Sequence, residues 1–295
     1  MTEASSSTAI DLSRLPAPSF VAPRSYDAIR AEQVAMLQEL IPEFDATIAS
    51  DPAVKLLDVF AYREQLLTDF YNQRALQVML AYSTGADLDQ LGANVNVERL
   101  VLEEGDLDTD PVYESDADFR RRIQLAPESF SVAGPDTAYR FHALSADASI
   151  ADASATSPSP GHVLISLLSR VGDGTASADQ IEAVEDIVTN RAVRPLTDMV
   201  SVASVELLPF VVLAALTLFH GPDRVVVLAA AEARLAAYIA AARKIGRPVT
   251  RSGIIAALHV EGVLNVALTH PAADVMASDA QVAHCTGADV TIADD

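Results

Sequence analysis

The spacing of apolar positions divides the chain into a helical first part and a mixed second part. From Ser25 to about Ile48 apolar residues recur at helical spacing, and Pro42 is expected to kink or split this helix. A longer helix is predicted to begin after Asp51, whose side chain can cap the first turn, with Pro52 at the first helical position. Its pattern continues for about 31 residues, which corresponds to roughly 46 Å of helix.

The apolar stripe on this long helix is the best candidate for contact with other helices. Such a stripe needs partners of similar length to bury it, so the pattern predicts an extended helical bundle. A glutamate interrupts the stripe and is expected to be paired, for example with an arginine from another helix. The predicted partner-interface residues are Leu57, Phe60, Glu64, Leu67, Tyr71, Val78 and Tyr82, and Ala75 lies on the same stripe.

From Gly134 onward the pattern changes to short helices and strands. Strands are predicted at 150–156, 162–169, 198–207 and 209–219, and Ser177 with Gln180 has the spacing of a capping box at a helix start. The order helix, strand, proline in 139–160 recurs in 252–271, which suggests a duplicated unit. The predicted fold class is α+β: a long N-terminal helical bundle segment followed by two small α+β modules that a duplication would relate.

Four parts make up the predicted domain organisation. Residues 1–24 are expected to form an extended arm, because three prolines at 16, 18 and 23 prevent regular helix. Residues 25–133 form a helical region with an acidic linker near 99–114. Residues 134–207 form the first α+β module, and residues 208–295 form the second, which ends in an acidic C-terminal tail.

Composition narrows the classes of partner. The 295 residues include 41 acidic and 20 basic side chains, which gives a net charge of −21. A field of this sign repels phosphate backbones and anionic lipids, so we expect no nucleic-acid binding. The apolar run 208–219 is too short to span a bilayer, so no membrane insertion is expected. With Cys285 as the only cysteine, neither an intrachain disulfide nor a cysteine-rich zinc site can form.

One acidic segment resembles a binding loop. The sequence "DLDQLG" at 87–92 is similar to the start of a calcium loop, but Leu91 stands where that loop needs an oxygen ligand. We therefore expect Gly85 to end the long helix in a left-handed conformation and Asp87 to cap the next short helix. The "GDGTAS" turn at 172–177 lacks the lysine of a phosphate loop, and it is expected to be a strand-to-helix turn.

The remaining motifs predict no chemistry. The six histidines lack metal-ligand spacing, and no nucleophile-elbow motif is present. The triplet "RRR" at 120–122 is expected to lie on a solvated or partner-facing helix surface. We predict no catalytic residue, no cofactor and no metal, although a Ser–His–Asp arrangement stays open because such triads are spatial.

Three segments carry a resemblance to a known family. The chain resembles the baseplate J-like proteins of contractile phage tails, as in Mu-like phages, and of related tailocins. The resemblance is carried, in the same order along the chain, by residues 51–99, 114–140 and 157–177, and the segment from Met79 to Leu91 is its most specific part. The resemblance covers most of residues 20–275. The acidic "LEEGDLDTDP" stretch and the Asp-rich C-terminus depart from it.

The resemblance implies a structural wedge protein of a baseplate, with residues 25–133 in the wedge core. The particle would be a phage, a tailocin or a related contractile injection system, assembled in the cytoplasm of a bacterial host. Implied partners are a second copy of the chain, a tail-protein-I-like wedge protein, a lysozyme-like sheath initiator and neighbouring wedges. Together they would form a ring around the tail hub and relay the change that triggers sheath contraction. The alternatives are an acidic cytoplasmic hydrolase and a helical adaptor in another complex.

Overall fold

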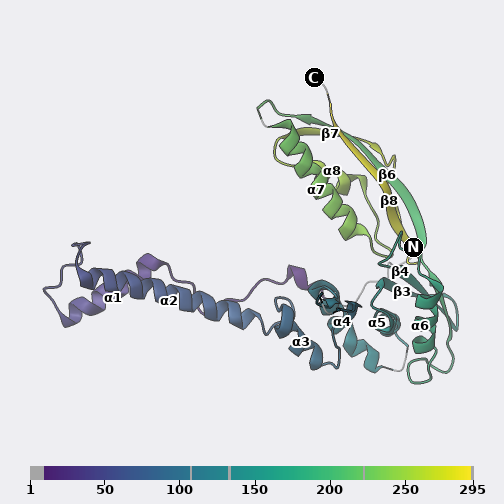
Figure 1. Ribbon diagram of the computed structural model, residues 1–295, viewed down its shortest axis with the longest axis horizontal. Coiled ribbons are helices and arrows are strands. Elements are labelled where there is room, and N and C mark those ends of the chain that lie inside the picture. Colours follow the sequence, from purple (N-terminus) through teal and green to yellow (C-terminus); the bar gives the residue numbers. More distant parts are fainter. Residues whose placement is uncertain (1–9, 107, 132–133, 222, 294–295) are drawn as a thin grey trace. The chain divides into compact units, whose positions relative to one another are not determined.

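The computed structural model describes residues 10–106, 108–131, 134–221 and 223–293 (Figure 1). Within these residues the chain forms eight α-helices and three small sheets, so the class is mixed α+β as predicted. The chain divides into two compact units. The helical unit comprises residues 10–99 and 115–120, and the sheet unit comprises residues 100–114 and the described residues from 121 onward.

The helical unit begins with a 3-10 turn, Leu12–Arg14, and a two-helix hairpin. Helix α1 (Tyr26–Leu40) starts where the Ser25 hydroxyl accepts the N–H of Ala28 at 3.2 Å. It ends before Pro42, so the expected helix to Ile48 is split rather than continuous. Helix α2 (Pro52–Leu76) starts as predicted, with the Asp51 carboxylate accepting the N–H of Ala53 at 2.7 Å.

Helix α2 is shorter than predicted. Its 25 residues correspond to about 37 Å, and it ends at Leu76 instead of continuing past Tyr82. Val78 and Tyr82 therefore lie beyond the helix, in the turns that lead to helix α3 (Gly85–Ala93). The prediction extended the helix too far because apolar residues continue at helical spacing past Leu76, where the chain forms successive turns.

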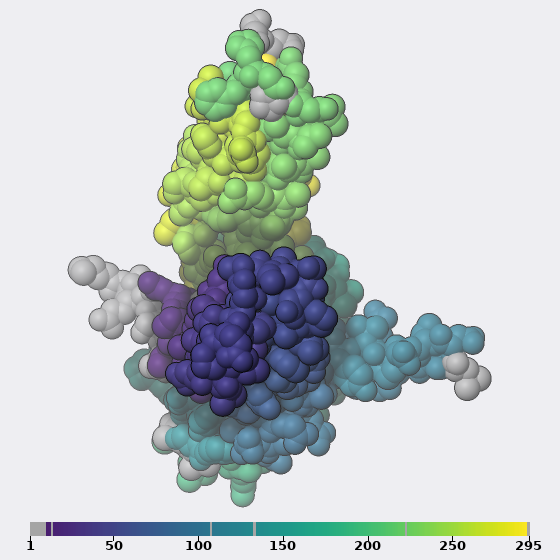
Figure 2. Space-filling view, turned by 90° about the vertical axis from the view of Figure 1, so that its left-hand side faces the viewer, coloured from purple at the N-terminus to yellow at the C-terminus, as the bar shows by residue number. Residues whose placement is uncertain are grey.

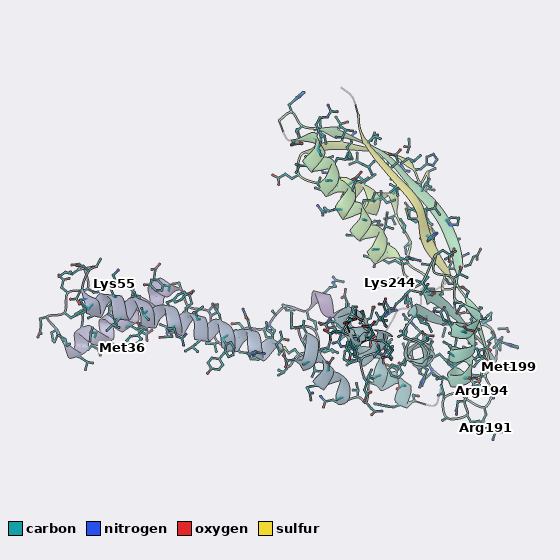
Figure 3. All side chains as sticks on the ribbon, viewed as in Figure 1. Met36, Lys55, Arg191, Arg194, Met199 and Lys244 are labelled. Atoms are coloured by element: carbon teal, nitrogen blue, oxygen red, sulfur yellow. The ribbon has the colours of Figure 1, made fainter. Side chains whose placement is uncertain are left out.

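The hairpin is held by a small apolar seam and by an ion pair between α1 and α2. Ile29, Val54 and Ala61 are buried between α1 and α2, and Figure 2 shows the surface of α1 (purple) against that of α2 (blue). Arg30 donates from Nε to Oδ1 of Asp58 at 2.7 Å. In Figure 3, Met36 and Lys55 mark the end where α1 leads into α2.

The predicted pairing of Glu64 is confirmed. Its carboxylate accepts the side-chain amide of Gln33 at 3.1 Å and lies 3.4 Å from a guanidinium nitrogen of Arg24, which precedes α1. Further along α2, the Asn72 side chain exchanges two hydrogen bonds of 2.9 Å with the backbone of Val21. The segment before α1 therefore lies along α2.

Between α3 and helix α4 the acidic linker forms a hairpin. Strand β1 (Val101–Glu103) pairs antiparallel with strand β2 (Val112–Tyr113). Helix α4 (Asp116–Leu125) follows, with Ser115 accepting the N–H of Asp118, and a 3-10 helix, Ala126–Phe130, continues it.

The first module of the sheet unit is a three-stranded sheet with two helices. Its elements are helix α5 (Asp136–Ala146), strand β3 (Ile150–Ser159), strand β4 (His162–Ser169), helix α6 (Ala178–Val188) and strand β5 (Met199–Ser204). Strand β4 is central, antiparallel to β3 and parallel to β5. The capping box of Ser177 and Gln180 is present at the start of α6. Tyr139, Leu167 and Val184 lie in the core.

The second module places two helices over another three-stranded sheet (Figure 1). Its elements are strand β6 (Glu206–Leu218), helix α7 (Arg224–Ala242), helix α8 (Arg251–Leu258), strand β7 (Val263–His270) and strand β8 (Gln281–Ile292). Strand β6 is central, antiparallel to β7 and parallel to β8. The region of the expected acidic tail thus contains a strand, since Val282, Ala283 and Val290 are buried in the module.

Helix α7 is the one helix of the described chain with the length and composition to cross a membrane. Its 19 residues include a window of mean hydropathy 1.8. Val227, Ala231 and Leu235 on this helix pack into the core over the sheet. Because core helices of soluble proteins pass the same test, it is weak evidence for a membrane span.

Candidate interaction sites

The segment from Thr84 to Arg99 is a joint in which arginines, not metal ions, hold the aspartates. Gly85 begins α3 with φ +54° instead of ending α2, so its left-handed conformation was predicted correctly but its place was wrong. Asp87 does not cap α3; it lies in the first turn, 3.8 Å from the Arg74 guanidinium. The carboxylate at the start of α3 comes from Asp116, which accepts the N–H of Gly85 at 3.2 Å.

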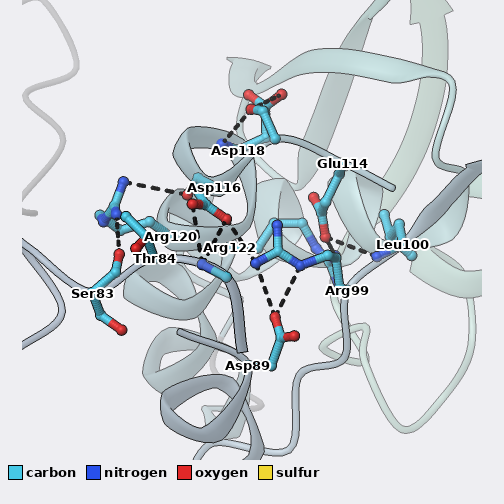
Figure 4. Close-up of polar contacts among 12 residues, drawn as sticks. Ser83, Thr84, Asp89, Arg99, Leu100, Glu114, Asp116, Asp118, Arg120 and Arg122 are labelled. Carbon is cyan, nitrogen blue, oxygen red and sulfur yellow. Dashed lines mark hydrogen bonds and ion pairs between the residues drawn. The ribbon is translucent and has the colours of Figure 1, made fainter. Parts of the chain in front are cut away.

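Arg99 is the centre of this joint (Figure 4). Its guanidinium donates to Oδ1 of Asp89 at 2.9 Å and lies 2.8 Å from Oδ1 of Asp116. The ring of Phe119 lies beneath it, 4.7 Å from the guanidinium carbon to the ring centroid. Burial acts to lower the pKa of Arg99, but its hydrogen bonds to the two carboxylates outweigh burial and raise that pKa.

Gly92 permits the close approach of α3 and α4. A Cβ at this position would lie 2.5 Å from Cζ of Phe119 and 2.7 Å from the carbonyl oxygen of Val97. Only a glycine therefore lets the Phe119 ring fit under the joint, and that ring is fully buried. The glycine that directly follows the most specific part of the family resemblance, Met79 to Leu91, therefore has a packing role.

The arginine triplet is not a free surface, so that prediction was wrong. Within the helical unit Arg120 donates to the carbonyl oxygen of Leu80 at 2.6 Å and also to that of Ser83. Within the sheet unit Arg121 donates to Asp152 at 2.7 Å, and Arg122 forms a buried ion pair with Glu114. Three consecutive side chains leave a helix at about 100° intervals, so they bind three different segments.

Two buried carboxylates anchor the sheet unit. Glu114 is 3% exposed and accepts from Arg122 and from the N–H of Leu100, the latter at 2.9 Å. Asp152, also 3% exposed, binds Arg121 and lies 3.7 Å from a guanidinium nitrogen of Arg140. Burial lowers the pKa of both Arg122 and Arg140.

Asp152 also links the two modules. Its Oδ2 accepts the N–H of Ile245, in the turn after α7, at 3.2 Å. Beside it Leu168, Val205 and Val282 form a core cluster with residues of both modules. The first and second modules therefore share a buried junction within the sheet unit.

One face of α2 is exposed and largely apolar, with Arg63 as the one charged residue within it. Positions 56, 59, 63, 66 and 70 follow steps of three and four residues, and residues 60, 67 and 71 lie next to them, which places the set on one side of the helix, away from the buried Val54 and Ala61. Each is between 43% and 61% exposed. We call this set the open face of α2: Leu56, Val59, Phe60, Leu66, Leu67, Phe70 and Tyr71.

The predicted interface residues divide between environments. Phe60, Leu67 and Tyr71 belong to the open face, and Val78 beyond the helix is 71% exposed. Leu57, Glu64 and Tyr82 are half-buried, and Tyr82 donates its hydroxyl hydrogen to the carbonyl oxygen of Leu15. The sequence interpretation did not include Leu56, Val59, Leu66 and Phe70, although their steps of three, seven and four residues place them on one side of a helix.

Three family models match consecutive parts of the chain. They are the baseplate J-like N-terminal domain over residues 49–106, the baseplate J-like central domain over 131–204 and the baseplate J-like protein C-terminal domain over 212–292. Baseplate protein J of Escherichia phage P2 is 44% identical over 288 residues, which cover 94% of this chain and 95% of that protein.

A solved structure with some likeness is the cryo-EM structure of the anti-feeding prophage baseplate, 6-fold symmetrised. The likeness has a TM-score of 0.42 at 14% sequence identity, and it covers 60% of this chain. The aligned part is 43% of the length of the chain in that structure.

Proposed function

Because the chain belongs to the baseplate J-like family, we propose that it acts in the baseplate as a wedge protein whose open face of α2 joins a helical bundle with partner chains. Membership of this family makes the protein a structural baseplate component and not an enzyme, which sets aside the hydrolase alternative. It also implies that the chain interacts with other baseplate proteins.

The open face of α2 carries this proposal. Monomeric proteins rarely expose a contiguous stripe of Leu, Val, Phe and Tyr, and such a stripe marks a protein contact. Five positions on this face, 56, 59, 63, 66 and 70, follow steps of three and four residues, which suits knobs-into-holes packing against another helix. In Arg63, the one charged member of this series, the aliphatic part can lie along an apolar partner.

The nature of the face suggests its partners. A helix that is buried on one side by α1 and apolar on the other side fits between two helices, as in a bundle. We propose a second copy of this chain and a tail-protein-I-like wedge protein as the chains that cover it. A lysozyme-like sheath initiator and neighbouring wedges would bind elsewhere, in a particle assembled in the host cytoplasm around the tail hub.

Helix α4 is the element we propose for relaying the change that triggers sheath contraction. Its residues contribute to both compact units, since the division falls between Arg120 and Arg121. Each of the two arginines is bound within its own unit. A displacement of the helical unit on receptor engagement would therefore act on the sheet unit through α4, together with the two other points at which the chain passes between the units, 99–100 and 114–115.

We also propose that the two modules arose by duplication. In each, a central strand has one antiparallel and one parallel neighbour. The strand order along the chain differs, because β4 follows its antiparallel neighbour whereas β6 precedes both of its neighbours.

The bundle proposal is tested by replacing Leu67 and Tyr71 with Asp in the full-length chain. Both side chains are about half exposed, so the isolated chain should keep its fold. We expect co-purification with the products of the neighbouring tail genes to be lost, while amide exchange protection of β6 and β8 is unchanged.

The matched control replaces Val225 and Val226 with Asp, because they are also exposed apolar residues at the surface of a helix. This variant should assemble normally. If the Leu67 and Tyr71 variant co-purifies as well as the control does, the open face of α2 is not the bundle contact.

A further inference from the structure

Strand β8 is an edge strand with little protection against pairing. Of the strands in the described residues, only β6 pairs with it. It is 12 residues long, and Asp289 is the first charged residue along it. Natural edge strands are usually blocked by charges, prolines or short length, so an open edge of this kind is a place where another strand can add.

A groove of about 770 Å³ lies beside this strand, within the sheet unit. One side is lined by β8 from Ala283 to Ala288, and the end of β4 at Leu168–Arg170 closes it. Helix α7 lines the other side with small residues, Ala236 and Ala240, which leaves room for incoming side chains. At Gly287 an added Cβ would meet nothing within 4 Å, so the backbone of β8 is accessible there.

One end of the groove is basic, which is unusual in this chain. Arg170 and Arg243 line it, and Lys244 follows at the end of α7 (Figure 3). One carboxylate, that of Glu232, also lines the groove. In a chain with 41 acidic and 20 basic residues, such a patch favours an acidic ligand.

The β1–β2 hairpin has the complementary properties. It pairs with no third strand in the described part of the chain, and Val112 and Tyr113 are 47% and 50% exposed. Between Val101 and Glu114 the sequence "VLEEGDLDTDPVYE" contains acidic but no basic side chains.

Three described residues of the hairpin loop, Asp106, Asp108 and Thr109, are joined by hydrogen bonds. Asp106 accepts the N–H groups of Asp108 and Thr109, each at 2.9 Å. These bonds lower the pKa of Asp106 below its usual value of 3.8. Hydrogen bonds that already restrict Asp106, Asp108 and Thr109 reduce the entropy that these residues would lose on binding.

We propose that the β1–β2 hairpin of one copy adds to strand β8 of a second copy, with the acidic loop against Arg170 and Arg243. The hairpin and the groove are different surfaces, so the contact is heterologous, and its repetition gives a ring or a filament. The strands of the hairpin are short, and few backbone hydrogen bonds form. The contact is therefore weak between two free chains and is strengthened when several copies are held together.

The test measures self-association of the full-length chain by sedimentation velocity over a range of concentrations. All samples carry the Leu67→Asp and Tyr71→Asp changes, so that the open face of α2 does not contribute. Ala236→Phe fills the groove, whereas Ala237→Phe, also exposed on α7 but outside the groove, is its matched control. Asp108→Arg with Asp110→Arg reverses charge on the hairpin.

We expect the parent and the Ala237→Phe variant to associate equally, with weaker association at high salt. Ala236→Phe and the hairpin variant should each associate at least about tenfold more weakly, equivalent to about 1.4 kcal/mol. An equimolar mixture of these two should recover dimers but nothing larger, because one supplies an intact hairpin and the other an intact groove.

Three results would overturn the proposal. One is equal association of the Ala236→Phe and Ala237→Phe variants, and another is no recovery in the mixture of folded variants. The third is a parent chain that stays monomeric at every concentration, which would assign the groove to a different protein. None of these results depends on whether the open face of α2 binds a partner, since that face is disabled throughout.

Discussion

Asp116 binds Arg99 and Gly85 with its two carboxylate oxygens. Its Oδ1 lies 2.8 Å from a guanidinium nitrogen of Arg99, and its Oδ2 accepts the N–H of Gly85 at 3.2 Å. One side chain from α4 therefore fixes both ends of the segment 85–99. The side chain of Arg99 is 14% exposed and that of Asp116 is 35% exposed, so water screens this ion pair only in part. The joint is a clamp on α3 that keeps the short helix against α4.

Replacing Arg99 with Lys should loosen this clamp. Lysine keeps the charge but loses the planar fork that reaches Asp89 and Asp116 together, and it stacks less well on Phe119. We expect a loss of about 1.5 to 3 kcal/mol in local stability. Amide hydrogen exchange across α3 measures it. The control is Arg74→Lys, because the Arg74–Asp87 pair is 3.8 Å long and largely exposed; its effect should stay below about 0.5 kcal/mol.

Replacing Gly92 with Ala should destabilise the chain, whereas this substitution in a helix usually stabilises. Alanine in a helix normally stabilises by about 1 kcal/mol relative to glycine. Here the new methyl group would collide with the Phe119 ring and the Val97 carbonyl oxygen, so we expect destabilisation of about 1 to 3 kcal/mol. Thermal unfolding followed by circular dichroism of the helical signal tests this. Gly287→Ala, which meets open space, should leave unfolding unchanged.

Local signals in the sequence predicted the elements that local chemistry determines. These elements depend on residues that are close to each other in the sequence, and all are present. They are the Asp51 cap, the capping box at Ser177 and the strands of the first module. The resemblance carried by residues 51–99, 114–140 and 157–177 predicted the family correctly.

Features that depend on contacts distant in sequence were missed. Nothing near Gly85 indicates that its capping carboxylate is Asp116, and nothing in "RRR" indicates that each arginine binds a different segment. Strand β8 was missed because its apolar positions do not alternate regularly and an acidic end follows. A bulge between its pairs with Phe210 and Val211 shifts the alternation by one residue.

Replacing Asp152 with Asn should weaken the junction of the two modules. The change removes a charge from a site where Arg121 and Arg140 are both partly or largely buried, and it leaves their charges uncompensated. We expect a loss of about 3 to 5 kcal/mol in the stability of the sheet unit. Faster amide exchange at Ile245 and along β3 would report it. Asp173→Asn is the control, since Asp173 is an exposed turn residue whose hydrogen bonds to Thr175 an asparagine can also make.

His142 should make the stability of the sheet unit depend on pH. Burial lowers the pKa of His142 below its usual value of 6.5, so the folded chain binds a proton less readily than the unfolded chain. The contribution of His142 to the free energy of unfolding is therefore fully present above about pH 6.5. It falls as the pH drops below about 6.5, until the pH passes the pKa of His142 in the folded chain. Carboxylates with lowered pKa, such as Asp58, lose their contribution only at lower pH, near and below 3.8.

The His142→Gln variant separates this effect from the others. Urea unfolding of the wild-type chain should show a decrease in stability between pH 7.5 and 5.5 that is reduced in this variant. His259→Gln, at an exposed position, should behave like the wild type. If all three chains lose stability equally over this range, protonation of His142 does not oppose folding, and the burial of its ring on α5 has no electrostatic cost.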